Sequence, residues 1–249
     1  MKSLITLIII AVGAIYFSPS VPPPPEGDRE RPGFAVIELF TSEGCSSCPP
    51  ADALIEKIRQ QQAGKLVYIL AFHVDYWNHL GWKDVFSEAA YTDRQRRYAN
   101  WLNLESVYTP QLVVNGRSEY VGSDEGAITK AIGAALALAT SDTVTLRAAV
   151  ANDQININYQ VPPNQKGELV LALVQKVAQS QVWAGENAGK QLTHLQIVRQ
   201  LVYMNIAHQN NVTMKTPAGF RAKDWELIGF VQNKTKGAIV SAGRAGFQL

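Results

Sequence analysis

The chain has 249 residues, which is enough for one large domain or two of ordinary size. Hydrophobic residues make up 47% and charged residues 18%, a composition typical of a globular protein. The net charge of +2 argues against a dedicated nucleic-acid-binding protein, and no block of five basic residues occurs. The densest basic stretch, residues 94–97, fits a solvated helix face better than a phosphate clamp. We therefore expect no nucleic-acid partner.

The N-terminus has the pattern of an export signal. An uncharged apolar run over residues 4–17 follows a positively charged start, and its length is typical of a signal peptide rather than a membrane span. Small residues allow cleavage after Ser20, although a nearby proline makes that site imperfect. We predict a signal peptide or N-terminal anchor over residues 1–20 and a stiff proline-rich linker over residues 21–32. The expected location is the bacterial periplasm or the medium, with inner-membrane anchoring by residues 4–17 if the signal is retained.

The only two cysteines, Cys45 and Cys48, are spaced as Cys-x-x-Cys. The nearly all-apolar residues 34–40 before them predict a buried strand, and apolar side chains at helical spacing over residues 51–61 predict a helix after them. Two prolines follow the second cysteine and fit only the first turn of a helix, so we expect this helix to begin close to Ser47. Export predicts an oxidising compartment, where such a pair can be a stable disulfide or a catalytic one.

Periodicity predicts the remaining elements of the first half: a strand at 65–72, a helix at 84–103, strands at 111–114 and 119–121, and a helix capped by Ser123. Asn115 and Gly116 are typical of a tight hairpin turn between the last two strands. The apolar positions of the second helix include Val85, Ala89, Ala99 and Leu102. This order indicates a parallel βαβ unit with an antiparallel hairpin at its edge.

The pattern changes after about residue 140. Short alternating runs separated by Gly and Asn turns replace the helical patterns, as in residues 143–150 and 155–159. We predict a mostly β, sandwich-like C-terminal domain over residues 141–249.

Three chemical interpretations of the cysteine pair stay open from the residues alone. An inert staple is one, although so small a loop removes little entropy from the unfolded chain. A metal site is the second. Zinc prefers four ligands, and the chain has only four histidines and no second cysteine pair, but copper held by Cys45, Cys48 and His73 is chemically reasonable. The third is a redox dithiol, in which the helix N-terminus lowers the pKa of one thiol. The strand–Cys-x-x-Cys–helix context favours the third.

In this context the chain resembles the thioredoxin superfamily, which implies an α/β, thioredoxin-like domain over residues 33–140. In that fold a cis-proline faces the cysteines, and Pro110, after Thr109, matches it. The resemblance implies that Cys45 attacks the substrate, Cys48 resolves the mixed disulfide, and Thr109 binds an extended substrate chain through its backbone. Glu38 corresponds to the superfamily's buried acid. It is either a proton acceptor for Cys48 or a carboxylate paired with a lysine or a backbone group.

Two positions depart from the thioredoxin pattern. Gly44 replaces the usual aromatic residue, and the Ser-Ser pair at 46–47 replaces Gly-Pro, so the direction of electron transfer is left unassigned. His73 ends the strand expected beside that of Glu38. We predict His73 and Trp77 as substrate-binding residues near the cysteines, with a structural histidine and a loop pinned by its aromatic residues as the alternatives.

A closer resemblance covers roughly residues 34–232. The stretch Phe-Thr-Ser-Glu-Gly-Cys-Ser-Ser-Cys-Pro-Pro-Ala-Asp at 40–52 is similar to the signature of an uncharacterised family of bacterial secreted proteins with a domain of unknown function. Residues 73–84, and residues 185–190 with His194, also look like that family's patterns. Residues 185–190 lack the spacing of a phosphate-binding loop, so we predict an ordinary loop there. The family implies no substrate.

Together these observations predict an exported thiol–disulfide oxidoreductase-like protein that acts on protein or small-molecule thiols and disulfides without a cofactor. Its fold is an α/β, thioredoxin-like domain followed by a mostly β domain. One alternative is a copper- or other metal-binding thioredoxin-like protein. The other is a non-catalytic binding module in which the disulfide is structural. The partners and the oligomeric state are left unassigned.

Overall fold

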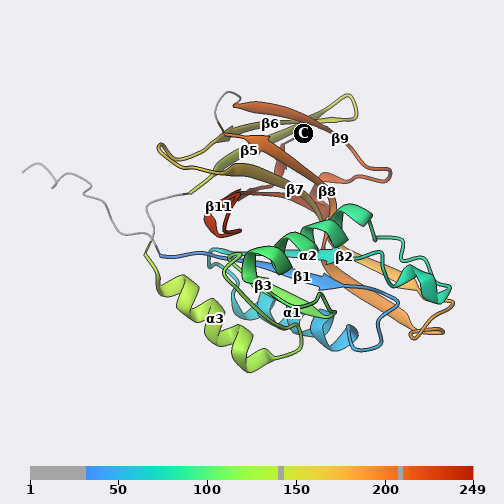
Figure 1. The fold of residues 1–249 in the computed structure, drawn as a ribbon. Coiled ribbons are helices and arrows are strands. Elements are labelled where there is room, and N and C mark those ends of the chain that lie inside the picture. The colour runs from blue at the N-terminus through green and yellow to red at the C-terminus, as the bar shows by residue number, and fades with distance from the viewer. Residues whose placement is uncertain (1–31, 140–142, 207–209, 249) are drawn as a thin grey trace, which may run out of the picture.

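The computed structural model describes residues 32–139, 143–206 and 210–248. Across these residues the chain is mixed α/β and mostly β, with twelve strands and three α-helices (Figure 1). The predicted signal or anchor lies outside the described residues, as does the linker except for residue 32. No helix in the described ranges is long and apolar enough to cross a membrane.

The first half contains four strands and three helices in the predicted order. Their bounds are β1 Ala35–Thr41, α1 Pro49–Gln61, β2 Val67–His73, α2 Ala89–Leu102, β3 Gln111–Val114, β4 Ser118–Val121 and α3 Glu125–Ala137, with a short 3₁₀ turn, η1 Asn78–Leu80. Strand β1 pairs in parallel with β2 and antiparallel with β3, which pairs antiparallel with β4. Asn115 and Gly116 have positive φ angles of 48° and 61°, as the predicted hairpin turn requires.

Helix α2 differs from its prediction in two ways: in the residue at which it begins and in which of its faces is buried. It begins at Ala89, because the preceding residues form a turn in which Asp84 accepts the backbone N–H of Phe86. Its buried side chains are largely polar, and the predicted apolar positions are not the buried ones: Val85 before the helix is 60% exposed. The predicted solvated face is also wrong at Arg94, which is buried. A helix can bury such a face when most of its polar groups find partners, as Arg94 does with Glu38.

The second half is built from strands: β5 Thr145–Ala151, β6 Gln154–Gln160, β7 Glu168–Gln181, β8 Gln191–Asn205, β9 Asn211–Lys215, β10 Trp225–Gln232, β11 Ile239–Ala245 and β12 Phe247–Gln248, with η2 Ala222–Asp224. They do not form a separate sheet system. Strands β11, β10, β7 and β8 continue the sheet of the first half in the order β11-β10-β7-β8-β2-β1-β3-β4, whereas β12-β5-β6-β9 form a second sheet. The large sheet therefore crosses the boundary that the sequence predicts near residue 140.

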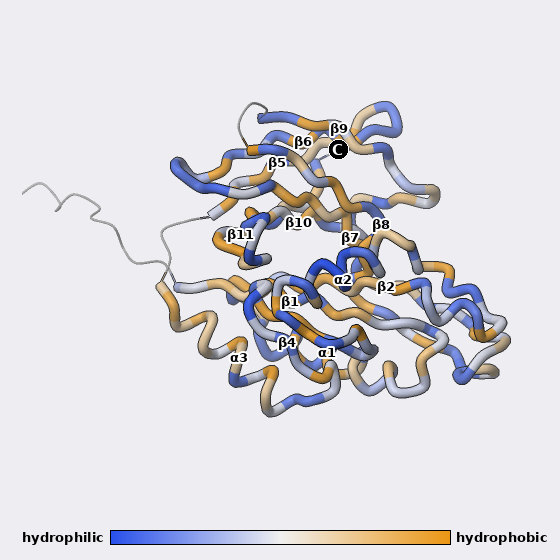
Figure 2. Tube along the Cα trace, viewed as in Figure 1, coloured by the Kyte–Doolittle hydropathy of each residue, from blue (hydrophilic) through white to orange (hydrophobic). Residues whose placement is uncertain are grey.

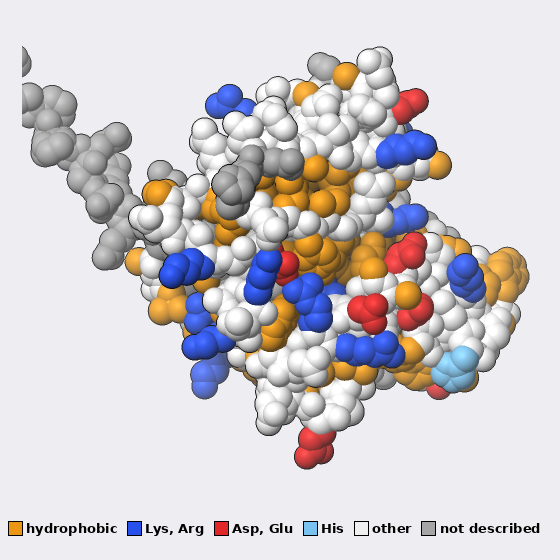
Figure 3. All heavy atoms as spheres, turned by 45° about the horizontal axis from the view of Figure 1, so that its top comes forward, with side chains coloured by type: hydrophobic (Ala, Val, Ile, Leu, Met, Phe, Trp, Pro, Cys, Tyr) orange, Lys and Arg blue, Asp and Glu red, His pale blue; other side chains and the backbone are white. Residues whose placement is uncertain are grey.

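Three clusters of buried hydrophobic residues lie on the two faces of the large sheet. Figure 1 shows the helices and the second sheet that cover it, and Figure 2 shows the hydropathy along each element. On one face α2 packs across strands from both halves, through residues such as Phe40, Phe72, Tyr98, Val170 and Phe230. On the other face α1 and α3 cover β1 to β3, and the four-stranded sheet covers β7 and β10. On the face that Figure 3 shows, basic and acidic side chains are interspersed.

Candidate functional site

The cysteine loop, residues 42–48, connects β1 to α1. Cys45 and Cys48 form a disulfide, and Cys48 is the N-cap residue immediately before α1, so the pair lies at the helix N-terminus. The Cys48 N–H donates to the Cys45 carbonyl at 3.2 Å, which closes the turn. Both cysteines are 0% exposed, whereas Ser46 and Ser47 between them are exposed. A substrate can thus meet the loop at its serines but must displace neighbouring groups to reach sulfur.

The segment before β3 lies beside this loop. The Thr109–Pro110 peptide bond is cis, and the Ser47 hydroxyl donates to the Thr109 carbonyl at 3.5 Å. The Trp77 indole N–H donates to the Thr109 hydroxyl at 2.8 Å. Trp77 also explains Gly44, because a Cβ at position 44 would lie 3.0 Å from the Cβ of Trp77. The structure thus brings the cysteine loop, Thr109 and Trp77 together.

Glu38 does not face the cysteine loop but lies in a buried polar network with Arg94 and Tyr98. Its carboxylate accepts from Arg94 Nε at 2.5 Å and Nη2 at 2.8 Å, and from the Tyr98 hydroxyl. Arg94 also donates to Tyr203 and Gln232, so this buried network joins β1 and α2 to β8 and β10. Residues 37 and 39 of β1 face α1, and Glu38 therefore points to the opposite face of the sheet. Glu38 is paired, with an arginine rather than the expected lysine.

His73 is a buried residue whose Nδ1 lies 2.7 Å from Asp84 Oδ2. Asp84 also accepts the Glu43 N–H at 2.9 Å. Burial would raise the pKa of Asp84, but His73 and the backbone N–H groups that it accepts outweigh burial and lower that pKa. Among the described residues no group of three His, Cys, Asp or Glu side chains is arranged to hold a metal ion.

An acid–histidine cluster of Glu43, Asp52 and His194 lies beside the cysteine loop. His194 Nε2 is 3.4 Å from Glu43 and Nδ1 is 3.3 Å from Asp52, as ion pairs rather than well-aligned hydrogen bonds. Burial would lower the pKa of His194, but the two carboxylates outweigh it and raise the pKa to about 9. His194 is therefore cationic near neutral pH. Its ring also lies 4.7 Å from that of His73.

The β7–β8 loop, residues 182–190, binds the backbone of the cysteine loop. Asn187 is fully buried, and its side-chain amide donates to the carbonyls of Glu43 at 2.9 Å and Cys45 at 2.8 Å. Glu186 accepts the Ser46 N–H at 2.9 Å. The Glu43 carboxylate accepts from Trp82 at 2.7 Å and from the Ser180 hydroxyl. The second half of the chain thus supplies part of the site.

Comparison with known proteins gives a family for this arrangement. Residues 36–232 match the family described as "Protein of unknown function (DUF1223)". The chain belongs to the DUF1223 family. No curated protein matches it.

Two solved structures are similar to this DUF1223 protein over most of its length. Protein AGR_C_4864 from Agrobacterium tumefaciens is 29% identical, with a TM-score of 0.62 over 84% of this chain and 92% of that protein. HBP35 of Porphyromonas gingivalis is 18% identical, with a TM-score of 0.60 over 87% and 76%. At 18% identity the second likeness concerns the fold alone.

Several residues of the DUF1223 site were missed from the sequence. Glu43, Asp52, Asp84 and Asn187 lie inside the family-like stretches 40–52, 73–84 and 185–190. Nothing in those stretches marks them individually, because their partners lie far away in the chain. The available signal was the resemblance of residues 185–190 and His194 to the same family as the cysteine motif. That loop was predicted correctly as a loop, but not as one that binds the cysteine loop.

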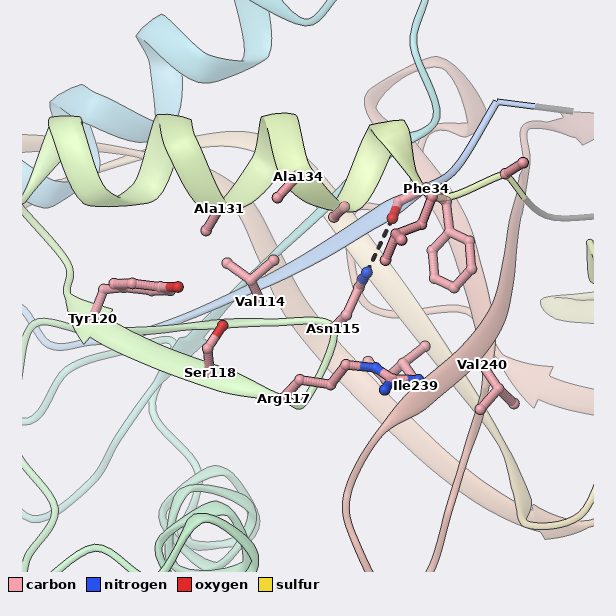
Figure 4. Close-up of a pocket in the computed structure, with 13 residues that line it drawn as sticks. Phe34, Val114, Asn115, Arg117, Ser118, Tyr120, Ala131, Ala134, Ile239 and Val240 are labelled. Atoms are coloured by element: carbon pink, nitrogen blue, oxygen red, sulfur yellow. Dashed lines mark hydrogen bonds between the residues drawn. The ribbon is translucent and has the colours of Figure 1, made fainter.

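A pocket of about 390 Å³ opens elsewhere on the DUF1223 fold, between the β3–β4 hairpin, α3 and β11 (Figure 4). Ala131 and Ala134 line it from the helix, and Val114 and Ile239 line it from the strands. The Asn115 amide lies at its wall and is occupied, since it donates to the Phe34 carbonyl at 3.0 Å. No residue of the cysteine loop lines this pocket, so it is separate from the disulfide.

Proposed function

We propose that this DUF1223 protein is an exported thiol–disulfide oxidoreductase, with a thioredoxin-like arrangement of residues 33–140 and Cys45–Cys48 as its reactive centre. The order β1-α1-β2-α2-β3-β4-α3 supports this arrangement, as does the parallel pairing of β1 with β2. The proposed location is the periplasm or the medium. The proposed substrates are protein or small-molecule thiols and disulfides, and no cofactor is required.

One observation carries the proposal: the disulfide lies at the start of α1 beside the Thr109–Pro110 segment. Ser47 of the cysteine loop reaches the Thr109 carbonyl. Pro110 lies close to the first turn of α1, because a Cβ on Gly122 would be 2.8 Å from Pro110 and 3.2 Å from Ala51. A helix N-terminus stabilises a thiolate. A purely structural disulfide has no thiolate for the helix N-terminus to stabilise, so this position favours a reactive pair.

In the proposed reaction a substrate thiolate attacks Cys45 Sγ, forming a substrate–Cys45 disulfide and releasing Cys48 as a thiolate that takes up a proton. A second substrate thiolate then attacks the substrate sulfur of that mixed disulfide and releases Cys45 as a thiolate. The substrate dithiol loses two electrons and the protein disulfide gains them. The reverse sequence reduces a substrate disulfide. We leave Glu38 out of the proton transfer, because Arg94 and Tyr98 occupy its carboxylate.

Insulin reduction and the reactivation of scrambled ribonuclease test this proposal. Cys48→Ser should accumulate a mixed disulfide on Cys45 because its resolving thiol is missing, whereas Cys45→Ser should accumulate none. Both variants should lose turnover. If the wild-type protein turns over neither substrate and Cys48→Ser traps nothing, the protein is not an oxidoreductase of this kind.

Burial of both sulfurs favours a second candidate, a binding module with a structural disulfide. A structural disulfide has a reduction potential below about −300 mV. The same Cys48→Ser variant distinguishes the two, because a thiol that stays buried forms no mixed disulfide with a protein substrate.

A further inference from the structure

The β7–β8 loop, from the second half of the chain, makes three hydrogen bonds to the backbone of the cysteine loop. The partners of these hydrogen bonds are 140 to 144 residues apart along the chain. Asn187 holds two carbonyls, those of Glu43 and Cys45, with one buried amide. Glu186 takes the N–H of the next residue, Ser46. Three hydrogen bonds therefore fix three backbone groups of the cysteine loop, at residues 43, 45 and 46.

The amide of Asn187 is itself held in place. Its side-chain oxygen accepts from Lys190 Nζ at 2.9 Å, and the base of the loop is closed by the Val182 and Lys190 backbones, whose N–H···O bond is 2.9 Å. The loop is therefore preorganised to present two N–H donors. A buried carbonyl that loses such a donor keeps the full cost of its desolvation. The cysteine loop thus depends on Asn187 for its backbone hydrogen bonding.

We propose that Asn187 is a positioning residue of the dithiol centre: from the second half of the chain, it holds the cysteine loop in the conformation in which Cys45 and Cys48 are bonded. Residue 187 acts through the loop backbone and touches no substrate. Reduction breaks the S–S bond, so the sulfurs no longer hold closed the turn in which the Cys48 N–H donates to the Cys45 carbonyl. The amide donated to that same carbonyl favours the closed turn. This inference rests on the proposed function for its importance, but its test does not.

The test is the equilibrium of the full chain with glutathione. The protein disulfide and two glutathione thiols give the protein dithiol and one glutathione disulfide, and the fraction of dithiol is counted by alkylation and mass. Asn187→Ala should move the equilibrium constant about tenfold toward the dithiol, a shift of about 30 mV. Gln179→Ala is the matched control. It removes a side-chain amide bonded to Thr193 on the exposed surface of the same hairpin and should change nothing.

Glu186→Ala provides a second variant if Asn187→Ala fails to fold. Glu186 is exposed, so its removal leaves the core intact, and it should move the same equilibrium two- to threefold toward the dithiol. Equal constants for the wild-type protein and the folded variants would overturn the proposal, as would a shift in Gln179→Ala as large as that in Asn187→Ala. Insulin turnover is not part of this test. A protein with no exchange activity still has a dithiol equilibrium, so the two proposals fail separately.

Discussion

Replacing His194 with glutamine should remove a specific pH dependence of stability. The side chain lies between Glu43 and Asp52 at 3.4 and 3.3 Å, and the third titratable group facing it is His73. The pKa of His194 is raised from 6.5 in the unfolded chain to about 9 in the fold. Because the folded pKa is the higher one, the protonated form stabilises the fold. That contribution is complete below about pH 6.5 and is lost as the pH rises through about 9.

The size of the effect follows from the shift. One pKa unit corresponds to about 1.4 kcal/mol, so the rise to about 9 gives a free energy of unfolding about 3 kcal/mol higher at pH 6 than above pH 9. His194 is 1% exposed, so solvent screens the interaction little. Urea unfolding of the oxidised protein at several pH values between 6 and 10 measures how steeply the free energy of unfolding falls with pH. His194→Gln should flatten that slope in this window.

The control for this experiment is His79→Gln, which changes an exposed histidine that contacts the Tyr76 carbonyl. That variant should keep the slope of the wild-type protein. The slope is compared rather than the stability itself, because any substitution of a buried side chain lowers stability. If His194→Gln and the wild-type protein lose stability equally between pH 6.5 and 9, His194 is not held as a cation by the two carboxylates.

Three further changes have expected outcomes. Arg94→Met should cost about 3–5 kcal/mol in urea unfolding, because it leaves the Glu38 carboxylate buried and unpaired; a loss under about 1 kcal/mol would contradict the pairing. Gly122→Ala should lower insulin turnover severalfold and stability by about 1–3 kcal/mol, since its Cβ would lie 2.8 Å from Pro110; unchanged turnover would separate Pro110 from the reaction. Gly133→Ala, in open space on α3, should instead raise stability by about 0.5–1 kcal/mol, and a loss would show that this helix face is not free.

Local sequence patterns were sufficient to predict the strands and helices of the first half of the fold. Residues 34–40 and 65–72 were expected as buried strands, and the observed strands are Ala35–Thr41 and Val67–His73. These predictions were close because a continuous apolar run of this length is typical of a strand that is buried on both faces of a sheet. The cap of α3 was wrong by one residue: Asp124 rather than Ser123 caps it, by accepting the Ala127 N–H. Either residue type suits that position, and sequence alone does not separate them.

The joining of the two halves could not be predicted. Strand β8 meets β2 through a single residue pair, Ala71 with Ile197, which leaves no trace in the periodicity of either strand. The buried polar face of α2 was hidden for a similar reason, because Arg94 is satisfied only by partners on distant strands. In the same way, the roles of Asn187 and His194 depend on contacts that only the folded chain creates. The Cys-x-x-Cys motif indicated where the candidate site lies, whereas the residues that surround it are brought together only by tertiary contacts.

The reduction potential of the Cys45–Cys48 disulfide tests the central claim most directly. It is obtained by equilibrating the full chain with glutathione or dithiothreitol buffers and counting free thiols. A working dithiol should have a potential above about −300 mV, in the range in which thiols of the surrounding compartment can exchange with it. A potential well below about −300 mV would mean that Cys45 and Cys48 form a structural staple, and would contradict the proposed function.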